Sequence, residues 1–409
     1  MENSAPRKTD WLSVAQLVIS ALGVAGMLLT AGALLVFGLV MGVTDSSQPG
    51  DLHTMLALSL TCLLIAGVLI PSIITSLRRV LDKSNLDPAK NSFRLASWMM
   101  IAFPLVVAAG SWLATKSLSW LFLPPIQIIA VALPLWWLVE LGSYRLERQS
   151  SQRRWGFLAF SLLISPAVIL TVELLVLAVM VGFLIAWVSQ QPDLALRFQV
   201  LGQALTSAEP DAERALQLIQ PLLKEPVLAF TGLAAISVVV PLIEEALKPL
   251  ALWMTAKRGL SPAQGFAGGL ITGAGFALLE SLGNLAAPVG DQWLILVLGR
   301  LGTGVLHIVT AGWMGWALAE YWAGGKIVKL GLVYLGVVVM HGVWNFCGLM
   351  LGFGPLMSGT PLELTGVWEQ ASRFAPYLLA ALIAILLGAM LWLNHHLHQK
   401  QENSTLPLG

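Results

Sequence analysis

The chain has 409 residues, of which 57% are hydrophobic and 11% are charged. Soluble globular proteins carry about 25% charged residues, so this composition excludes that class and indicates an integral membrane protein. The net charge of +1 gives no field that would attract nucleic acid, and the two cysteines, Cys62 and Cys347, form neither a disulfide framework nor a zinc motif.

Apolar stretches of about 20 residues are long enough to cross a bilayer as helices. Ten such stretches are predicted, which makes the fold class an all-α, polytopic membrane helix bundle. The first follows the N-terminus without a small-residue cleavage site, so we expect it to be retained. In chain order the spans cover residues 14–39, 55–74, 95–114, 120–138, 157–188, 227–255, 264–287, 293–321, 330–351 and 377–393.

Loop charges predict the orientation of these spans. Lysine and arginine are enriched on the cytoplasmic side of short loops, and an even number of spans with both termini inside places most of the 23 basic residues there. The one long outer segment covers residues 190–226. Its stretch 207–226 has acidic residues ahead of a 3.6-residue apolar period, which predicts a short amphipathic helix. A connector resting on the outer surface is favoured over an element that captures substrate.

Small residues recur every four positions along the seventh span. This pattern allows a neighbouring helix to approach closely, so we interpret it as a packing surface. Close packing of this kind brings polar groups on different spans together. The stripe consists of Gly265, Gly269, Gly273, Ala277 and Ser281.

The sixth span contains three ionisable residues within five positions, Glu244, Glu245 and Lys248, bracketed by Pro241 and Pro249. Each ionisable side chain at the centre of a membrane helix costs about 2.5–3.5 kcal/mol, so such a group indicates a function. Because Glu244 and Lys248 share a helix face, the lysine can offset one carboxylate and leave the other available.

The next three spans also carry polar residues at depth. One such residue would usually join two helices by a hydrogen bond, but carboxylates, imidazoles, an amide and a lysine on four consecutive spans indicate a functional site. Arg300 is interpreted separately, as a side chain that extends toward the outer interface. The residues are Phe276, Glu280 and Asn284 in the seventh span, Arg300 and His307 in the eighth, and His341 and Asn345 in the ninth.

This combination of side chains suits the hydrolysis of an amide bond. Clustered carboxylates repel one another, so one holds its proton while another stays ionised, as general acid–base chemistry requires. A carboxylate can take a proton from water, and a histidine with an asparagine one turn away can donate hydrogen bonds to an oxyanion. Glutamate and neutral histidine are also zinc ligands, although the chain lacks the HExxH spacing. No cofactor is assigned, and zinc stays open.

At these residues the sequence resembles the PrsW family of intramembrane proteases, which belongs to a superfamily with the CAAX prenyl endopeptidases and the bacteriocin-processing homologues. Ordered motifs on four successive spans carry the resemblance, which covers about residues 227–351. They are EExxK at Glu244 to Lys248, GFAxxE at Gly275 to Glu280, His307 with Gly312 and Gly315, and HGxxN at His341 to Asn345.

The resemblance implies a glutamate-dependent endopeptidase that cleaves membrane-anchored proteins, with anti-sigma factors as the substrate class associated with the family. It implies that Glu244 or Glu245 activates water and that Glu280 assists. Ser281 departs from the family pattern, in which we expect asparagine after the motif glutamate. The remaining implied site residues are His341 and Asn345 for the oxyanion, His307 to complete the site, and Lys248 and Phe276 in support.

The expected domain organisation has three parts. Residues 1–156 form a four-helix membrane extension, residues 157–351 the PrsW-like protease core with the outer loop 190–226, and residues 352–409 the last helix and a cytoplasmic tail. The expected partners are the lipid bilayer and a membrane-anchored protein substrate, without nucleic acid, and the expected location is the cytoplasmic membrane of a bacterium.

Other functions stay open from the sequence. A transporter or proton-coupled carrier would use the same buried carboxylates as a relay, and a CAAX-type prenyl-protein peptidase would use related motifs. A scaffold or immunity factor built on a degenerate protease fold is disfavoured, because every expected polar side chain is present.

Overall fold

The structure is a computed structural model that describes residues 10–43, 49–81, 92–206, 218, 222, 225–256, 259–287, 290–357 and 365–405. Within these ranges every regular element is a helix and no strand occurs, so the predicted all-α fold class is confirmed.

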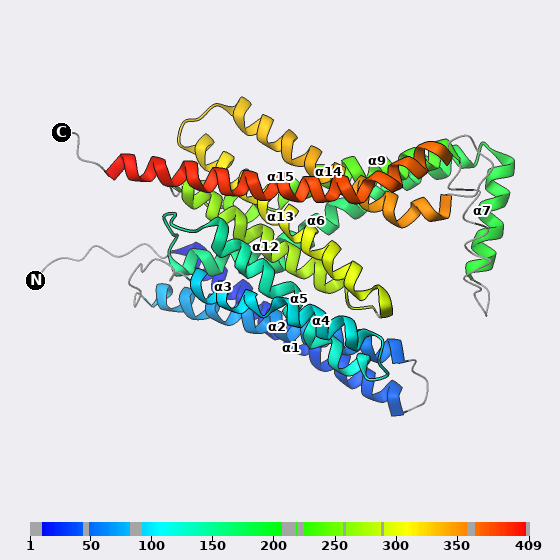
Figure 1. The fold of residues 1–409 in the computed structure, drawn as a ribbon, viewed down its shortest axis with the longest axis horizontal. Helices are drawn as coiled ribbons and strands as arrows, with labels where there is room; N and C mark the ends of the chain where they lie inside the picture. Colours follow the sequence, from blue (N-terminus) through cyan, green and yellow to red (C-terminus); the bar gives the residue numbers. More distant parts are fainter. Residues whose placement is uncertain are drawn as a thin grey trace, which may run out of the picture. The chain divides into compact units, whose positions relative to one another are not determined.

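The elements described in the first half of the chain are all helices (Figure 1). In chain order they are α1 (Trp11–Val43), α2 (Pro49–Val80), α3 (Phe93–Ile101), α4 (Phe103–Ala114), α5 (Ser119–Gly142), α6 (Ser151–Val188) and α7 (Pro192–Leu205).

The second half contains shorter elements before its long helices. A π-helix, η1 (Ala235–Val239), lies between α9 (Pro226–Ala234) and α10 (Val240–Leu247). The elements that follow are α11 (Leu250–Trp253), α12 (Pro262–Asn284), η3 (Gly290–Gln292), α13 (Trp293–Trp322), α14 (Ile327–Met357) and α15 (Thr365–Thr405).

The predicted number of spans is confirmed over the described ranges. Nine helices are long and apolar enough to cross a membrane, and the pair α3 and α4 makes up to ten if it is one span bent by 44°. This pair is the third predicted span. Pro104 lies in the first turn of α4 and lacks the N–H that an uninterrupted helix would need there. The predicted orientation, with both termini in the cytoplasm, stays a prediction.

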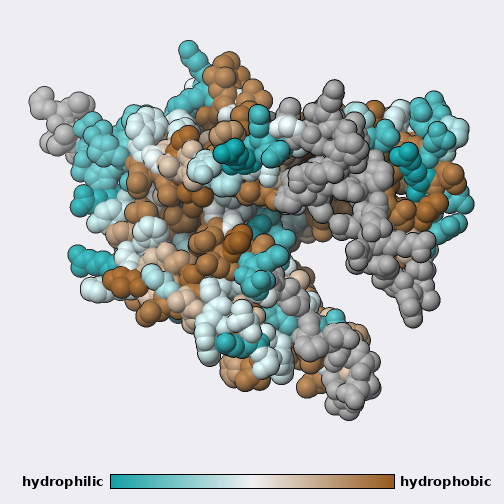
Figure 2. Space-filling view, turned by 45° about the vertical axis from the view of Figure 1, so that its right-hand side comes forward, coloured by the Kyte–Doolittle hydropathy of each residue, from teal (hydrophilic) through white to brown (hydrophobic). Residues whose placement is uncertain are grey.

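Large apolar side chains are exposed along the spans. Leu29 is 76% exposed, and Leu105 and Phe183 are each 74% exposed. Hydrophobic residues also cover much of the face drawn in Figure 2. Such surface is unfavourable in water and favourable against lipid tails, which supports the membrane assignment.

Contacts divide the chain into two compact units. Unit 1 comprises Met1–Pro166, Lys248–Val333 and Ile385–Gly409, and unit 2 comprises Ala167–Leu247 and Tyr334–Ala384. The limits fall inside α6, α14 and α15 and between α10 and α11. The three-part domain organisation expected from the sequence stays a prediction.

The closest helix packing in unit 1 joins α12 and α13, which lie side by side (Figure 1). A Cβ atom on Gly269 would overlap the carbonyl of Ala311, and one on Gly273 would overlap the carbonyl of His307. The glycines of the predicted packing stripe therefore do allow close approach, and this prediction is confirmed. The contact at Gly273 fixes the depth of His307 against α12.

A buried ion cluster lies at the C-terminal end of α5, also in unit 1. The carboxylate of Glu140, which is fully buried, lies 2.9 Å from Arg148 and also contacts Arg154. The backbone N–H of Ser92 donates to the same carboxylate at 3.3 Å. This cluster joins the end of α5 to the start of α6 and to the residue before α3.

Unit 2 has its own apolar core, formed by α9, α14 and the first part of α15. Cys347, Met350 and Ala375 are buried together there. A second cluster places Leu194 and Leu201 of α7 against Trp187 at the end of α6.

Helix α7 was not predicted, although Pro192 at its first position is a typical start signal. Most of the stretch 207–226, in which the amphipathic helix was expected, lies outside the described residues.

Candidate active site

The first group of site residues lies in unit 2, on the short helix α10. The π-helix η1 precedes it directly and Pro241 occupies its first turn. Glu244 is 8% exposed and Glu245 is fully buried. Two adjacent carboxylates at this depth need polar partners, because an ionised carboxylate in an apolar environment is strongly destabilised.

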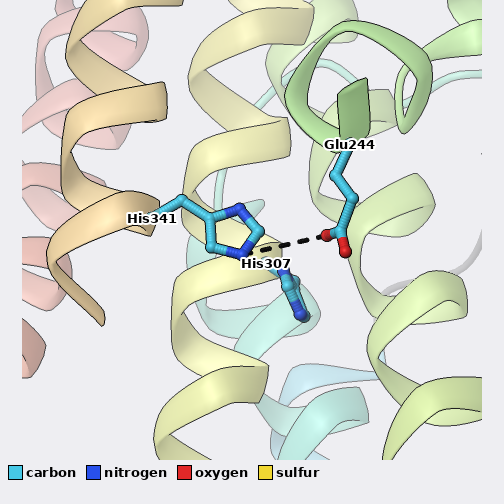
Figure 3. Close-up of side chains that lie close together, drawn as sticks. All are labelled: Glu244, His307 and His341. Atoms are coloured by element: carbon cyan, nitrogen blue, oxygen red, sulfur yellow. Dashed lines mark ion pairs between the residues drawn. The ribbon is translucent and has the colours of Figure 1, made fainter. Parts of the chain in front are cut away.

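His341 on α14 supplies one of these partners. Its Nδ1 lies 2.8 Å from Glu245 Oε1. Its Nε2 lies 3.9 Å from Glu244 Oε2, the contact marked by the dashed line in Figure 3. An ionised carboxylate only accepts hydrogen bonds, so Nδ1 carries the hydrogen in this contact. The Nε2 atom then faces Glu244 with its lone pair.

The gap between His341 and Glu244 has a chemically useful length. At 3.9 Å it is too long for a direct hydrogen bond. Two ligands of one tetrahedral zinc ion, with bonds of about 2.0–2.2 Å, lie roughly 3.3 Å apart, and a bridging water accommodates somewhat longer gaps. The pair is therefore arranged to hold a third group between the imidazole and the carboxylate.

Asn345, one helical turn beyond His341, has a different partner. Its Nδ2 donates to the backbone carbonyl of Ile236 in η1, at 2.9 Å. The sequence placed Asn345 and His341 together as donors to an oxyanion. In the structure the amide of Asn345 is directed to the backbone that precedes the two glutamates.

The second group of site residues lies in unit 1. His307 on α13 lies between two partners, with Nε2 2.8 Å from Glu280 Oε2 and Nδ1 2.7 Å from Lys248 Nζ. An ammonium group only donates, so Nδ1 accepts and Nε2 carries the hydrogen that Glu280 receives. Lys248, His307 and Glu280 thus form a continuous hydrogen-bonded chain.

Phe276 packs against this chain. Its ring meets the ring of His307 edge to face, with the centroids 5.1 Å apart, and Lys248 Nζ lies 4.9 Å from its centre. The aromatic ring therefore fixes the plane of the imidazole and offsets part of the lysine charge. The structure thus places Phe276 and Lys248, the two residues expected in support, beside His307.

Arg300 is the residue that the sequence interpretation missed. Its guanidinium lies 2.7 Å from Glu280 Oε2, and its Nε donates to Ser281 Oγ at 3.2 Å. Arg300 therefore pairs with a carboxylate on the neighbouring helix α12, a contact that its interpretation as a side chain extending to the interface did not include. Ser281, which departs from the family pattern, is the residue that orients this guanidinium.

Asn284 does not join the cluster around Glu280. Its Nδ2 donates to the backbone carbonyl of Glu280 at 3.0 Å. This bond satisfies a carbonyl in the last turn of α12, where helices lack intrahelical donors. Asn284 therefore caps its own helix.

Fold and site together define a polytopic membrane protein in which carboxylates on candidate membrane spans are paired with imidazoles. The family model of the PrsW family intramembrane metalloproteases matches residues 170–361. These residues therefore form a PrsW family intramembrane metalloprotease domain, and the protein is a peptidase of the membrane. No curated protein and no solved structure matches the chain.

A metalloprotease family implies a metal ion, so the side chains of the site can be compared with those that bind metals in proteins. Within unit 2, a carboxylate oxygen of Glu244 and Nε2 of His341 lie 3.9 Å apart, and glutamate and histidine are both zinc ligands. Glu245 supports Nδ1 of His341 as carboxylates commonly support metal-binding histidines.

His307, in unit 1, is less available to a metal ion than these two residues. Both of its ring nitrogens have hydrogen-bond partners within unit 1, so metal binding would require it to exchange one of them. Glu244 and His341 therefore fit a metal best.

Proposed function

We propose that this protein is an endopeptidase that hydrolyses a peptide bond in membrane-anchored protein substrates, with regulatory proteins such as anti-sigma factors as the substrate class. The observation that supports this most strongly is the arrangement of His341 between Glu245, at 2.8 Å, and Glu244, at 3.9 Å. An imidazole oriented by one carboxylate and facing another is suited to holding a water molecule and taking its proton.

In the proposed reaction, water lies between Glu244 and Nε2 of His341. Glu244 accepts a proton as the water oxygen bonds to the carbonyl carbon of the substrate. The proton then passes to the departing nitrogen as the C–N bond breaks, which gives a new carboxylate and a new amine. Glu245 keeps the imidazole oriented through Nδ1, as the third member of a catalytic triad does.

We propose that the cluster of Glu280, His307 and Lys248 serves the same reaction. Glu244 and Lys248 are four residues apart in the chain. Lys248 in turn lies 2.7 Å from His307. In this proposal Glu280 and His307 assist by donating or accepting protons.

We infer that a divalent metal, if it takes part, is held by Glu244 and His341. When bound, such an ion polarises a carbonyl group and lowers the pKa of water. The other residues keep their tasks. Glu245 orients His341, and Lys248 with Glu280 fixes the tautomer of His307.

The proposal is tested by mapping new protein termini in membranes. Cells that express the wild-type chain or a variant are compared by terminal labelling and mass spectrometry, which detects cleavage products whatever the substrate is. We expect cleavage products with the wild type that disappear when any one of the site residues is replaced. The variants are Glu244→Gln, Glu245→Gln, Glu280→Gln, His307→Ala and His341→Ala.

Two matched controls lie on α15 beyond the apolar part of its span, Glu402→Gln and His395→Ala. Both should cleave as the wild type does. All variants must also insert into the membrane at wild-type levels. If the same products persist in every site variant, the proposed peptidase mechanism is wrong.

A further inference from the structure

One face of α14 holds the helix that carries the two glutamates. Tyr334, His341 and Asn345 are spaced by seven and four residues, so they share this face. Tyr334 donates its hydroxyl hydrogen to the carbonyl of Leu242 at 2.8 Å, and Asn345 donates to the carbonyl of Ile236 at 2.9 Å. Both contacts, like that of His341 with Glu245, lie within unit 2.

The hydrogen-bond pattern of η1 explains why Ile236 requires a side-chain donor. In an α-helix the carbonyl of Ile236 would accept from the N–H of Val240, but that N–H bonds to Ala235, five residues back. In the π pattern the next donor belongs to residue 241, which is proline and has no N–H. Neither backbone pattern provides Ile236 with its usual donor.

Asn345 supplies a donor at this position. A backbone carbonyl without a partner is costly in a membrane, where no lipid group can donate to it. Gly342 allows the approach, because a Cβ atom there would overlap the carbonyl of Ser237. The glycine brings α14 against η1, and the amide one turn away reaches Ile236.

We propose that Asn345 is a positioning residue whose side-chain amide replaces the N–H that Pro241 lacks and so maintains the π-helical turn ahead of Glu244 and Glu245. A π-helical turn contains one residue more than an α-helical turn. If it relaxed to α, the residues after it would rotate by about 100° relative to α9. Glu244 and Glu245 would then no longer face His341.

This inference rests on the proposed function only for the catalytic use of the two glutamates. The experiment therefore combines two measurements that need no substrate with one that does. Deuterium uptake of the peptide covering residues 236–248 and the Tm are measured on the full-length protein in detergent. Cleavage is measured on the products mapped by terminal labelling.

The test compares the single variant Asn345→Ala with two double variants built on it. Asn345→Ala should raise deuterium uptake of the peptide several-fold, lower the Tm and lower the cleavage rate about tenfold. Adding Pro241→Ala restores an N–H for Ile236 and should return uptake, Tm and cleavage to near wild-type values. Adding Pro249→Ala, which removes the other proline of the segment, should restore none of them.

The outcomes separate the possibilities. Rescue of Asn345→Ala by Pro241→Ala but not by Pro249→Ala supports the proposal. A general packing defect or a lost oxyanion donor would not be repaired by a backbone N–H. An Asn345→Ala variant with unchanged uptake, or one that Pro241→Ala does not rescue, would overturn it. If wild-type cleavage is absent, the proposed function fails, and the uptake and Tm measurements still decide the role of Asn345.

Discussion

Arg300 and Glu280 form an ion pair of 2.7 Å between α13 and α12, within unit 1. The same carboxylate oxygen, Oε2, lies 2.8 Å from Nε2 of His307. Glu280 therefore forms an ion pair with a guanidinium and a hydrogen bond with an imidazole at once. In this arrangement Glu280 is a hydrogen-bond acceptor.

Replacing Arg300 should impair catalysis through Glu280. With Arg300→Met, the carboxylate loses its permanent cation and its orientation, and we expect kcat/KM to fall at least about tenfold, or 1.4 kcal/mol. Arg300→Lys keeps the charge but lacks the planar fork that reaches both Glu280 and Ser281, so its loss should be smaller. Arg197→Met, which changes an exposed residue of α7, is the control. Equal activity of Arg300→Met and wild type would refute a role for this ion pair.

The glycine packing between α12 and α13 should be sensitive at one position and tolerant at another. In Gly273→Ala the new methyl group would overlap the carbonyl of His307, and overpacking of this kind costs about 1–3 kcal/mol. Gly283→Ala, on the same helix, meets no atom within 4 Å and should be neutral or stabilising by up to about 1 kcal/mol.

The Tm in detergent measures both changes. We expect a lower Tm for Gly273→Ala, with activity reduced because His307 is displaced. A Tm that falls equally in the two variants would show that close approach of the helices does not matter at residue 273.

The buried cluster around Glu140 should matter for stability more than for catalysis. Glu140→Gln leaves Arg148 and Arg154 without their carboxylate, and removing one partner of a buried ion pair typically costs about 3–5 kcal/mol. The Tm should fall strongly, while protein that remains folded should cleave normally. Glu147→Gln, which removes an exposed carboxylate nearby, should change the Tm little. The prediction fails if the two variants unfold at the same temperature.

If a metal takes part in the reaction, the metal content of the purified protein should depend on Glu244 and His341 of unit 2. We expect about one divalent ion per chain in purified protein, and loss of that ion in Glu244→Gln and in His341→Ala. His395→Ala should keep it. Elemental analysis by mass spectrometry measures this directly and independently of cleavage. Ion content that neither substitution changes would contradict metal binding by these residues.

Much of the fold follows from the sequence because membrane spans have a simple physical signature. Long apolar stretches locate the helices, and the small residues at 269 and 273 correctly predict close packing. The break in the third predicted span was not foreseen, since hydropathy averages over Pro104. Helix α7 was missed because its composition is only weakly apolar, and Pro192 was its main signal.

The sequence predicts which residues belong to the candidate site better than it predicts the contacts that each of them makes. Ionisable residues are costly in lipid, so their presence alone singled out Glu244, Glu245, Glu280 and the two histidines. The partners depend on which faces of the helices meet, and a single sequence does not provide this. Arg300 was therefore assigned outward, although it pairs with Glu280.

Asn345 shows the same limit of sequence interpretation. A short motif placed it beside His341 as a donor, whereas the structure directs its amide to Ile236. The signal that could have been used is Pro241, whose missing N–H implies a backbone acceptor in need of a donor.

The most direct measurement is cleavage in water enriched in oxygen-18. A substrate found by terminal labelling is reconstituted in liposomes with purified wild-type protein or with Glu244→Gln. We predict that the wild type places one heavy oxygen in the new C-terminal carboxylate and that Glu244→Gln yields almost no product. Product that lacks the heavy oxygen, or equal rates for the two proteins, would contradict hydrolysis by water activated at Glu244.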